Sequence, residues 1–240
     1  MMRLTDYKIL TFDVYGTLID WESGIVNSLS GLTDQVSGHI SRDEILEAHA
    51  YFESSAQHWT PAKSYSNLLA TVYRRLAEHW QISVSWEDCV TYGQSVGNWP
   101  AFSDSAASLQ YLKEHFLLAV LTNTDNQNFS GSQAQLGVTF DGIYTAEDIG
   151  SYKPADRNFE FLIETLAHRG IQKTQILHVA ESMFHDHGPA NRHEIANCWI
   201  YRRHDQSGFG ATMNPGDLPT VDFTFNSLSD FVAAHQKEIG

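Results

Sequence analysis

The sequence predicts an α/β protein, in which a doubly wound parallel sheet carries a helical subdomain inserted after its first strand. Three observations lead to this prediction. The run Ile9–Phe12 is short and apolar, as is typical of a buried strand. Residues 20–98 then show mostly helical periodicity. After residue 104, short apolar runs alternate with amphipathic stretches, a rhythm that indicates βαβ units and a parallel sheet.

Helical signals recur through the inserted segment. Residues 21–38 carry apolar side chains at helical spacing and end at a glycine. The next helix is expected to begin at Ser41, because Glu44 follows three residues later and completes a capping box. Two more helices are expected, over residues 64–80 and from Ser85 onward.

The length of this helical segment predicts a separate cap. Connections between strands and helices usually have about 2–6 residues, far fewer than are found here. We therefore predict that residues 20–98 form an inserted cap, and that residues 1–19 and 99–240 form the α/β core. Further strands are predicted at residues 116–121, 140–144, 176–180, 198–201 and 223–225, with helices at 104–115, 157–169 and 227–239.

Composition narrows the class of protein. The 240 residues include 15 Lys and Arg against 29 Asp and Glu, a formal charge of −14, which disfavours a nucleic-acid partner. No run approaches the roughly 18 apolar residues of a membrane span, and the N-terminus lacks a secretory pattern. We expect a cytoplasmic protein that does not bind membranes. Cys89 and Cys198 provide no disulfide framework and no metal-ligand spacing.

Asp13 is the first candidate for chemistry, because it ends the predicted first strand. Ligands of open α/β sheets bind beyond the carboxyl ends of the strands. A carboxylate there, with Gly16 allowing close backbone approach and Thr17 offering a hydroxyl, is able to attack an electrophile and form an ester. The simpler interpretation is an aspartate that ends a strand before a turn.

Other polar side chains follow later strands. Thr122 and Asn123 end a predicted strand, as Asp13 does, and so are expected at the same edge of the sheet. Lys153 precedes a proline, which favours an extended backbone. A lysine fixed near Asp13 would lower the pKa of the carboxyl and keep it ionised; an ordinary surface lysine is the alternative.

A fourth cluster, VAESMFHDHGPA at residues 179–190, follows another strand. Glu181 and Asp186 are two carboxylates, and Ser182 lies beside Glu181. His185 is a candidate to assist an attacking water or a leaving group, whereas His187 is expected to be structural.

Together these segments resemble the motifs of the haloacid dehalogenase superfamily. The matching strings are D-V-Y-G-T at residues 13–17, L-T-N at 121–123 and K-P at 153–154. The resemblance implies a Rossmann-like core with a helical cap, Asp13 as nucleophile, and Thr122 and Lys153 at the site. In phosphatases of this superfamily an acidic fourth motif holds Mg²⁺, which would here involve Asp13, Glu181 and Asp186.

Tyr15 favours one branch of this superfamily. The phosphatases have a second Asp at this place as general acid, and the ordinary pKa of tyrosine near 10 makes it a poor replacement. The tyrosine form resembles the type II, L-2-haloacid dehalogenase-like branch, which displaces a leaving group from carbon. That resemblance implies a hydrolase that requires no cofactor, with Asp13, Thr17, Lys153 and Asp186 catalytic.

The resemblance also implies a small carboxylic acid substrate, bound with water. The substrate contacts implied are Tyr15, Thr122, Asn123, Ser182, Arg42 and Phe159. Within the branch, the sequence is similar to a hydrolase that opens azetidine-2-carboxylate, a strained cyclic amino acid. A Mg²⁺-dependent phosphatase and a non-catalytic scaffold are the alternatives. Aromatic residues in the cap are compatible with a homodimer.

Overall fold

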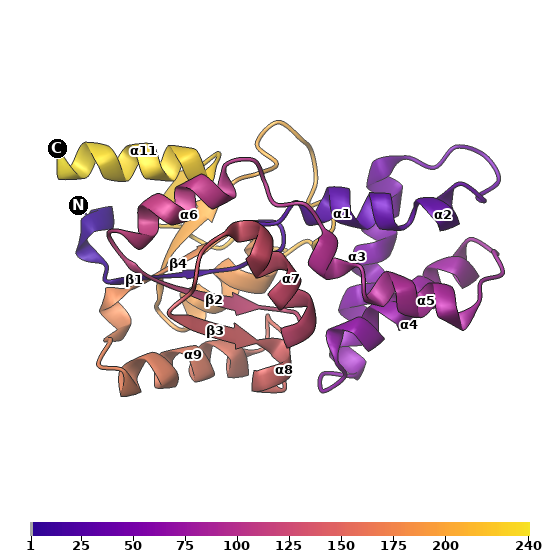
Figure 1. Cartoon of the computed structure of the whole chain (residues 1–240), viewed down its shortest axis with the longest axis horizontal. Coiled ribbons are helices and arrows are strands. Elements are labelled where there is room, and N and C mark those ends of the chain that lie inside the picture. Colours follow the sequence, from indigo (N-terminus) through magenta and orange to yellow (C-terminus); the bar gives the residue numbers. More distant parts are fainter. Residues whose placement is uncertain (1) are drawn as a thin grey trace.

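The computed structural model describes residues 2–240 and contains a six-stranded parallel sheet (Figure 1). The strand order is β3-β2-β1-β4-β5-β6, and all neighbouring strands pair in parallel. The strands are β1 (Ile9–Phe12), β2 (Leu117–Thr122), β3 (Gly142–Thr145), β4 (Ile176–Ala180), β5 (Ala196–Ile200) and β6 (Phe223–Phe225). The chain proceeds outward in one direction from β1 to β3 and in the other from β4 to β6. The carboxyl end of β1 therefore lies at a topological switch point, where open α/β sheets bind ligands.

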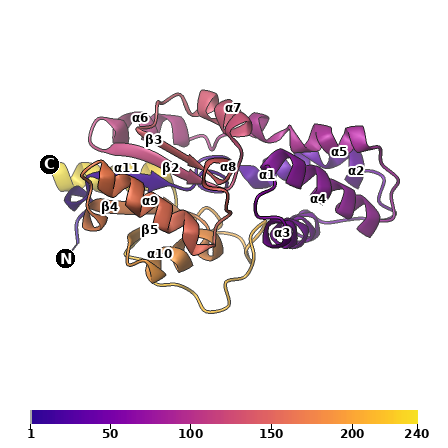
Figure 2. The same cartoon turned by 90° about the horizontal axis from the view of Figure 1, so that it is seen from below.

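Helices cover both faces of the sheet, as the two views show (Figures 1 and 2). Successive residues of a strand point to opposite faces. Leu10 and Phe12 belong to a core with α6 (Ser105–Lys113), α7 (Asn126–Leu136) and α11 (Leu228–Ile239). Ile9 belongs to a second core, with α9 (Asp156–His168) and α10 (Gly188–Arg192). The sheet is thus buried on both sides. Because both faces are buried, its strands are continuous apolar runs in the sequence.

The segment between β1 and β2 forms a group of helices beyond one end of the sheet (Figure 1). Its helices are α1 (Trp21–Ser28), α2 (Ser30–Thr33), α3 (Arg42–Trp59), α4 (Tyr65–His79) and α5 (Trp86–Gly93). The predicted capping box at Ser41 is present, and a second one begins α5 at Ser85. The expectation of one helix over residues 21–38 is wrong. Ser30 and Gly31 have low helix propensity, and the segment forms two short helices followed by a turn.

The two connections between the cap helices and the sheet pair with each other. Ile19 and Ala101 form an antiparallel bridge. The Asp20 N–H donates to the Pro100 carbonyl at 2.8 Å, and the Phe102 N–H donates to the Leu18 carbonyl at 3.0 Å. This pairing places the cap over the carboxyl end of β1.

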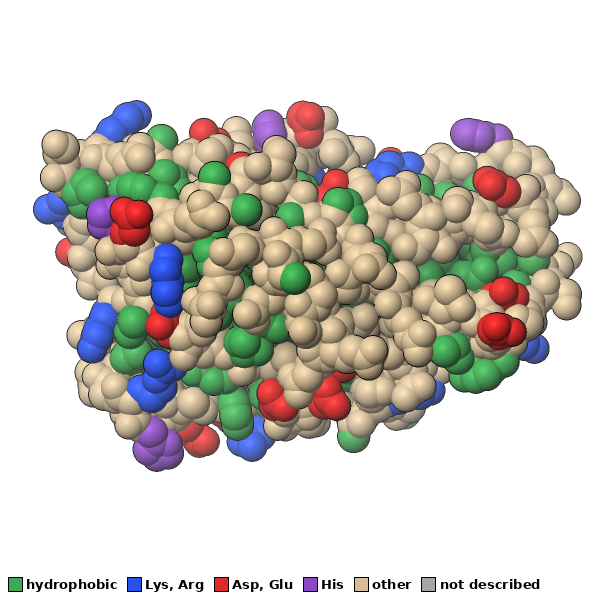
Figure 3. All heavy atoms as spheres, in the orientation of Figure 1, with side chains coloured by type: hydrophobic (Ala, Val, Ile, Leu, Met, Phe, Trp, Pro, Cys, Tyr) green, Lys and Arg blue, Asp and Glu red, His purple; other side chains and the backbone are tan. Residues whose placement is uncertain are grey.

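The remaining short elements are α8 (Ala146–Ile149), the 3₁₀ turns η1 (Leu4–Asp6), η2 (Val96–Asn98) and η3 (Lys173–Gln175), and the π-helical turn η4 (Met183–His187). Within residues 2–240, no helix is both long enough and apolar enough to cross a bilayer. On the face drawn in Figure 3, Lys and Arg side chains are interspersed with Asp and Glu and form no continuous basic stripe.

Candidate active site

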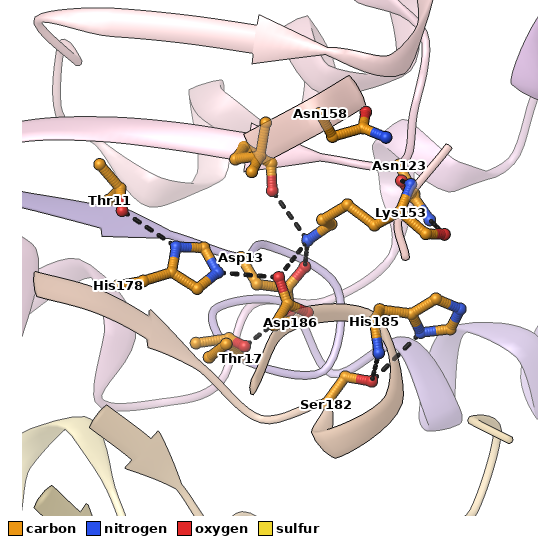
Figure 4. Close-up of polar contacts among 12 residues, drawn as sticks. Thr11, Asp13, Thr17, Asn123, Lys153, Asn158, His178, Ser182, His185 and Asp186 are labelled. Carbon is orange, nitrogen blue, oxygen red and sulfur yellow. Dashed lines mark hydrogen bonds and ion pairs between the residues drawn. The ribbon is translucent and has the colours of Figure 1, made fainter. Parts of the chain in front are cut away.

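The Asp13 carboxylate lies at the carboxyl end of β1 and is only 6% exposed. Its Oδ1 accepts a hydrogen bond from Lys153 Nζ at 2.9 Å, and its Oδ2 accepts one from the Thr17 hydroxyl at 2.7 Å (Figure 4). A turn at Gly16 brings Thr17 back beside Asp13. The φ of Gly16 is +99°, a value that glycine readily adopts. Both carboxylate oxygens are therefore held in one orientation.

Lys153 is 1% exposed, and its ammonium group has three oxygen partners. Nζ donates to Asp13 Oδ1, to Asp186 Oδ1 at 2.6 Å and to the Leu121 carbonyl at 2.9 Å. Asn123 fixes the backbone of this lysine: its Nδ2 donates to the Lys153 carbonyl at 2.9 Å, and its Oδ1 accepts from the Lys153 N–H at 2.7 Å. Asn123 thus positions Lys153, and Lys153 joins the two carboxylates.

His178 is a member of this network that the sequence did not indicate. Its Nε2 lies 2.9 Å from Asp186 Oδ1, and its Nδ1 lies 2.9 Å from the Thr11 hydroxyl (Figure 4). An ionised carboxylate only accepts hydrogen bonds, so the network assigns the proton to Nε2 and lets Nδ1 accept from Thr11. The contact with Thr11 fixes the His178 ring, and the ring in turn orients the Asp186 carboxylate.

Electrostatics distinguish the two carboxyl groups. Burial raises the pKa of Asp13 above its ordinary value, although Lys153 and Thr17 act in the opposite direction. Burial also disfavours ionised Asp186, but there Lys153 and His178 prevail and hold its pKa well below the usual range. Burial alone would lower the pKa of Lys153; the two carboxylates outweigh it and raise that pKa. Lys153 lowers the pKa of Asp13, as expected from the sequence, but burial and the nearby Asp186 outweigh this effect, so the net shift is upward.

The site lies in a small cavity of about 20 Å³ between core and cap. A cavity of this size holds about one water. The core side is lined by Asp13, Tyr15, Asn123, Lys153, Ser182, His185 and Asp186, and the cap side by Trp21, Glu53, Gln57 and Tyr65. A larger hollow of about 340 Å³ shares Gln57 and Lys153 with this cavity. This hollow therefore adjoins the cavity on the side of Gln57 and Lys153.

Tyr15 and Ser182 line the cavity, as expected for substrate contacts, but their hydroxyls are engaged. The Tyr15 hydroxyl lies 3.0 Å from Ser132 Oγ, and burial raises its pKa. The Ser182 hydroxyl accepts from the His185 N–H at 3.0 Å and caps the π-helical turn. Burial lowers the pKa of His185 to about 4, so this ring is neutral at pH 7. Thr122 is buried at the end of β2, and its hydroxyl has no partner within residues 2–240.

The structure does not bring three of the expected substrate contacts to the cavity: Thr122, which is buried at the end of β2, Arg42 and Phe159. The Arg42 side chain is 45% exposed and lies 3.8 Å from Glu22 Oε2, in a separate hollow. It begins α3, and the cavity is lined by later turns of that helix. Phe159 is fully buried, with its ring 5.2 Å from that of His178. It supports His178 from α9 rather than contacting a bound molecule.

The three carboxyl groups considered as Mg²⁺ ligands, those of Asp13, Glu181 and Asp186, are not arranged to bind one ion. Glu181 lines the same separate hollow as Arg42 and does not line the cavity that contains Asp13 and Asp186. The Lys153 ammonium occupies the space between the two remaining carboxylates. Over residues 2–240, no three His, Cys, Asp or Glu side chains converge as metal ligands. The donor set of a Mg²⁺-dependent phosphatase is therefore not assembled.

His187 does not line the cavity. Its ring nitrogens lie 3.0 Å from Asn197 Oδ1 and 3.0 Å from the Ala180 carbonyl. Both contacts join it to neighbouring strands, in agreement with a structural role.

Two further residues were missed in the sequence: Glu53 and Gln57 of α3, both buried and both lining the cavity. With His49 they form a polar stripe at four-residue spacing, on the buried side of the helix. That spacing was visible in the sequence, but polar residues on a helix normally indicate its solvent-facing side.

Thr17 links the loop after β1 to the end of β4, and its removal is predicted to destabilise the fold. Its oxygen accepts from the Glu181 N–H at 2.8 Å while its hydroxyl donates to Asp13. We expect Thr17→Val to lower the free energy of unfolding by about 1–3 kcal/mol, because it leaves a buried N–H and a buried carboxylate oxygen without a partner. Urea unfolding measures this change, with Thr139→Val in an exposed loop as control. Equal stability of the two variants would contradict the prediction.

The fold and the site define a hydrolase in which a buried carboxylate lies between an α/β core and a helical cap. The chain belongs to the haloacid dehalogenase-like hydrolase family, whose profile matches residues 7–182. It is 22% identical over 216 residues to (S)-2-haloacid dehalogenase 4A of Burkholderia cepacia, which covers 82% of this chain and 84% of that enzyme.

Solved structures share the fold at low identity. A crystal structure of an L-2-haloacid dehalogenase superposes with a TM-score of 0.77 at 18% identity, covering 98% of this chain and 100% of that one. The L-2-haloacid dehalogenase of Xanthobacter autotrophicus, solved with chloropropionic acid covalently bound, gives a TM-score of 0.76 at 16% identity, covering 96% and 98%. The whole chain, cap included, thus has the architecture of these enzymes.

Proposed function

We propose that this hydrolase acts at carbon on a small 2-substituted carboxylic acid, through an ester formed on Asp13. The observation that carries the proposal is the Asp13 carboxylate itself. It lines a small cavity between core and cap and is held by the Lys153 ammonium and the Thr17 hydroxyl. A fixed, desolvated carboxylate is a suitable nucleophile for in-line displacement.

In the first step, an Asp13 oxygen attacks C2 of the substrate and the leaving group departs with the bonding electrons. The carboxylate loses its negative charge as the ester forms. Lys153 remains paired with Asp186 throughout, so the ammonium is not left without a partner.

In the second step, water attacks the carboxyl carbon of the ester and releases a 2-hydroxy acid. Asp186 is suited to orient this water. Its Oδ1 is fixed by Lys153 and His178, whereas its Oδ2 has no hydrogen-bond partner among residues 2–240. The neutral ring of His185 also lines the cavity and is placed to accept a proton.

Tyr15 favours chemistry at carbon over phosphoryl transfer. Loss of an alkoxide from phosphorus requires a general acid, and here burial makes the Tyr15 hydroxyl a weaker acid than an ordinary tyrosine. A halide leaves without a proton, and a protonated ring nitrogen already carries one. A 2-haloacid and a strained cyclic amino acid such as azetidine-2-carboxylate are therefore the two substrate classes that suit the site.

Oxygen labelling under single-turnover conditions tests this proposal. Enzyme in excess is mixed with L-2-chloropropionate or L-azetidine-2-carboxylate in H₂¹⁸O containing EDTA. We expect the peptide that contains Asp13 to gain two mass units while the product of this first turnover stays unlabelled, because water attacks the enzyme's carboxyl carbon. Label in the product and none in Asp13 would mean direct attack by water. No turnover of either substrate would reject the proposal.

A further inference from the structure

We infer that the Glu53 carboxylate of the cap binds a positively charged nitrogen at C2 of the substrate, so that the group displaced is a ring amine rather than a halide. This inference rests on the proposed function, because it names the substrate class of the same site. Glu53 would touch the substrate directly, opposite the attacking Asp13.

Glu53 lies in α3 on the side that faces Asp13 across the cavity, and it is 6% exposed. Its Oε1 accepts from Gln57 Nε2 at 2.9 Å and from the Tyr65 hydroxyl at 2.8 Å. Its Oε2 accepts no hydrogen bond from residues 2–240, and the nearest basic atom is His49 Nδ1 at 3.4 Å. Burial lowers the pKa of His49 to about 3, so this ring brings no charge. The carboxyl group is oriented by two neutral donors and lacks a cation.

A buried carboxylate without a cation is costly. Burial accordingly raises the pKa of Glu53 to about 7, although the Tyr65 hydrogen bond acts in the opposite direction. An incoming ammonium group would supply the missing charge. The positive group on the core side cannot do so, since Lys153 is already bound to Asp13 and Asp186.

The balance of charge around the cavity distinguishes the two substrate classes. Three carboxyl groups line it, those of Asp13, Glu53 and Asp186, against the single ammonium of Lys153. A departing halide would meet the Glu53 carboxylate and no cation, because Arg42 lies in the separate hollow. A haloacid anion adds one negative charge to the site, whereas an amino-acid zwitterion adds no net charge and its ammonium supplies a cation beside Glu53. The residue types present therefore favour an amino acid over a haloacid.

The reaction balances for a protonated four-membered ring. Asp13 forms a bond to C2, and the C2–N bond breaks with its electron pair moving to nitrogen. The nitrogen enters as a secondary ammonium with two hydrogens and leaves as a neutral primary amine, so no acid is required at this step. Hydrolysis of the ester then releases one proton, which the amine accepts.

Several titratable groups surround Glu53, and any pH dependence must be read against them. They are His49 of α3, Tyr65 of α4, Tyr92 of α5, and Tyr152 in the loop between α8 and α9. Burial raises the pKa of each of these tyrosines. Across the cavity, His185 is neutral and Asp186 is strongly acidic. Among residues 2–240, Glu53 is the one group on the cap side of the cavity with a pKa of about 7, while burial also raises the pKa of Asp13 on the core side.

The test compares two substrates with one pair of variants. For Glu53→Gln we expect kcat/KM on L-azetidine-2-carboxylate to fall by about 100-fold or more, as for loss of one partner of a buried charge pair. The kcat/KM on L-2-chloropropionate should fall much less, so the ratio of the two kcat/KM values, ring substrate over haloacid, should also decrease. Glu47→Gln, an exposed residue of the same helix, is the matched control and should leave both unchanged.

A pH profile separates binding of the nitrogen from a structural role. With the ring substrate, kcat/KM of the unaltered enzyme should rise as Glu53 ionises near pH 7, and Glu53→Gln should lack this rise. Tyr65→Phe removes a donor to the carboxylate, so the pKa of Glu53 should increase and the rise should move to higher pH. The Tyr65→Phe profile also remains informative if Glu53→Gln does not fold.

The outcomes separate the inference from the proposed function. If the enzyme dehalogenates L-2-chloropropionate and leaves the ring substrate intact, or if Glu53→Gln lowers both activities equally, the inference is overturned and the proposed function stands. An unchanged pH profile in Tyr65→Phe also overturns the inference. If neither substrate is turned over, the proposed function fails as well.

Discussion

Asp13→Asn lowers kcat by at least about 10⁴-fold, the scale seen when a nucleophile is removed. The carboxamide carries no negative charge and does not attack C2. The fold should persist, because the amide oxygen is able to accept from Lys153 while the amide nitrogen donates to Thr17 Oγ. The change is measured as release of amine or halide in the presence of EDTA, with circular dichroism to verify folding.

Asp34→Asn is the matched control for this loss, since Asp34 is an exposed aspartate that follows α2. It should retain the full rate. Residual activity of a few per cent in Asp13→Asn, with solvent oxygen found in the first product, would mean that water attacks carbon without a covalent intermediate.

The central part of the site was predictable because the signals for it are local. Ile9–Phe12 is an apolar run that ends at Asp13, and Gly16 provides the turn. Parallel strands bring their carboxyl ends to one edge of the sheet. That rule alone places Thr122 near Asp13, and it places Asp186, which follows β4, on the other side.

The cap side of the site could not be predicted in the same way. Which face of α3 points to the cavity depends on how the cap docks on the core, and no local signal in the sequence encodes that. Glu53 was therefore not singled out, and Arg42 was expected to bind substrate although it lies about three helical turns before Glu53, the first residue of α3 that lines the cavity. The family resemblance suggested an arginine here, whereas the cap places a carboxyl group in the cavity.

Buried polar residues that stand within apolar segments of the sequence were also missed. His178 stands inside the strand Ile176–Ala180, where a single polar residue does not alter the strand prediction. Its partners, Thr11 and Asp186, come from a neighbouring strand and from the following turn. The net upward shift of the Asp13 pKa was not visible for a related reason: it depends on burial, which a sequence does not display.

Lys153→Met should have the second large effect, and it should act on both activity and stability. The substitution keeps the length of the side chain and removes the cation shared by Asp13 and Asp186. Breaking a buried ion pair in this way typically costs about 3–5 kcal/mol of unfolding free energy. We also expect kcat/KM to fall by about 10²–10³-fold, as when one preorganised electrostatic contact is removed. Urea unfolding and steady-state kinetics measure the two effects, with Lys173→Met at a partly exposed ion pair as control.

The pH dependence of the stability lost in Lys153→Met tests whether the loss arises from repulsion between the Asp13 and Asp186 carboxylates. The pKa of the Asp13 carboxyl is already raised by burial in the native protein, and loss of the lysine removes an effect that lowers it. A carboxyl whose pKa is higher in the folded than in the unfolded state binds its proton more tightly when folded, so stability increases as pH falls through that raised pKa. The variant should therefore recover part of its stability as the pH is lowered from neutrality, relative to the unaltered protein. A deficit that stays constant as the pH is lowered would mean that the two carboxylates do not repel each other, and that Lys153 contributes through packing alone.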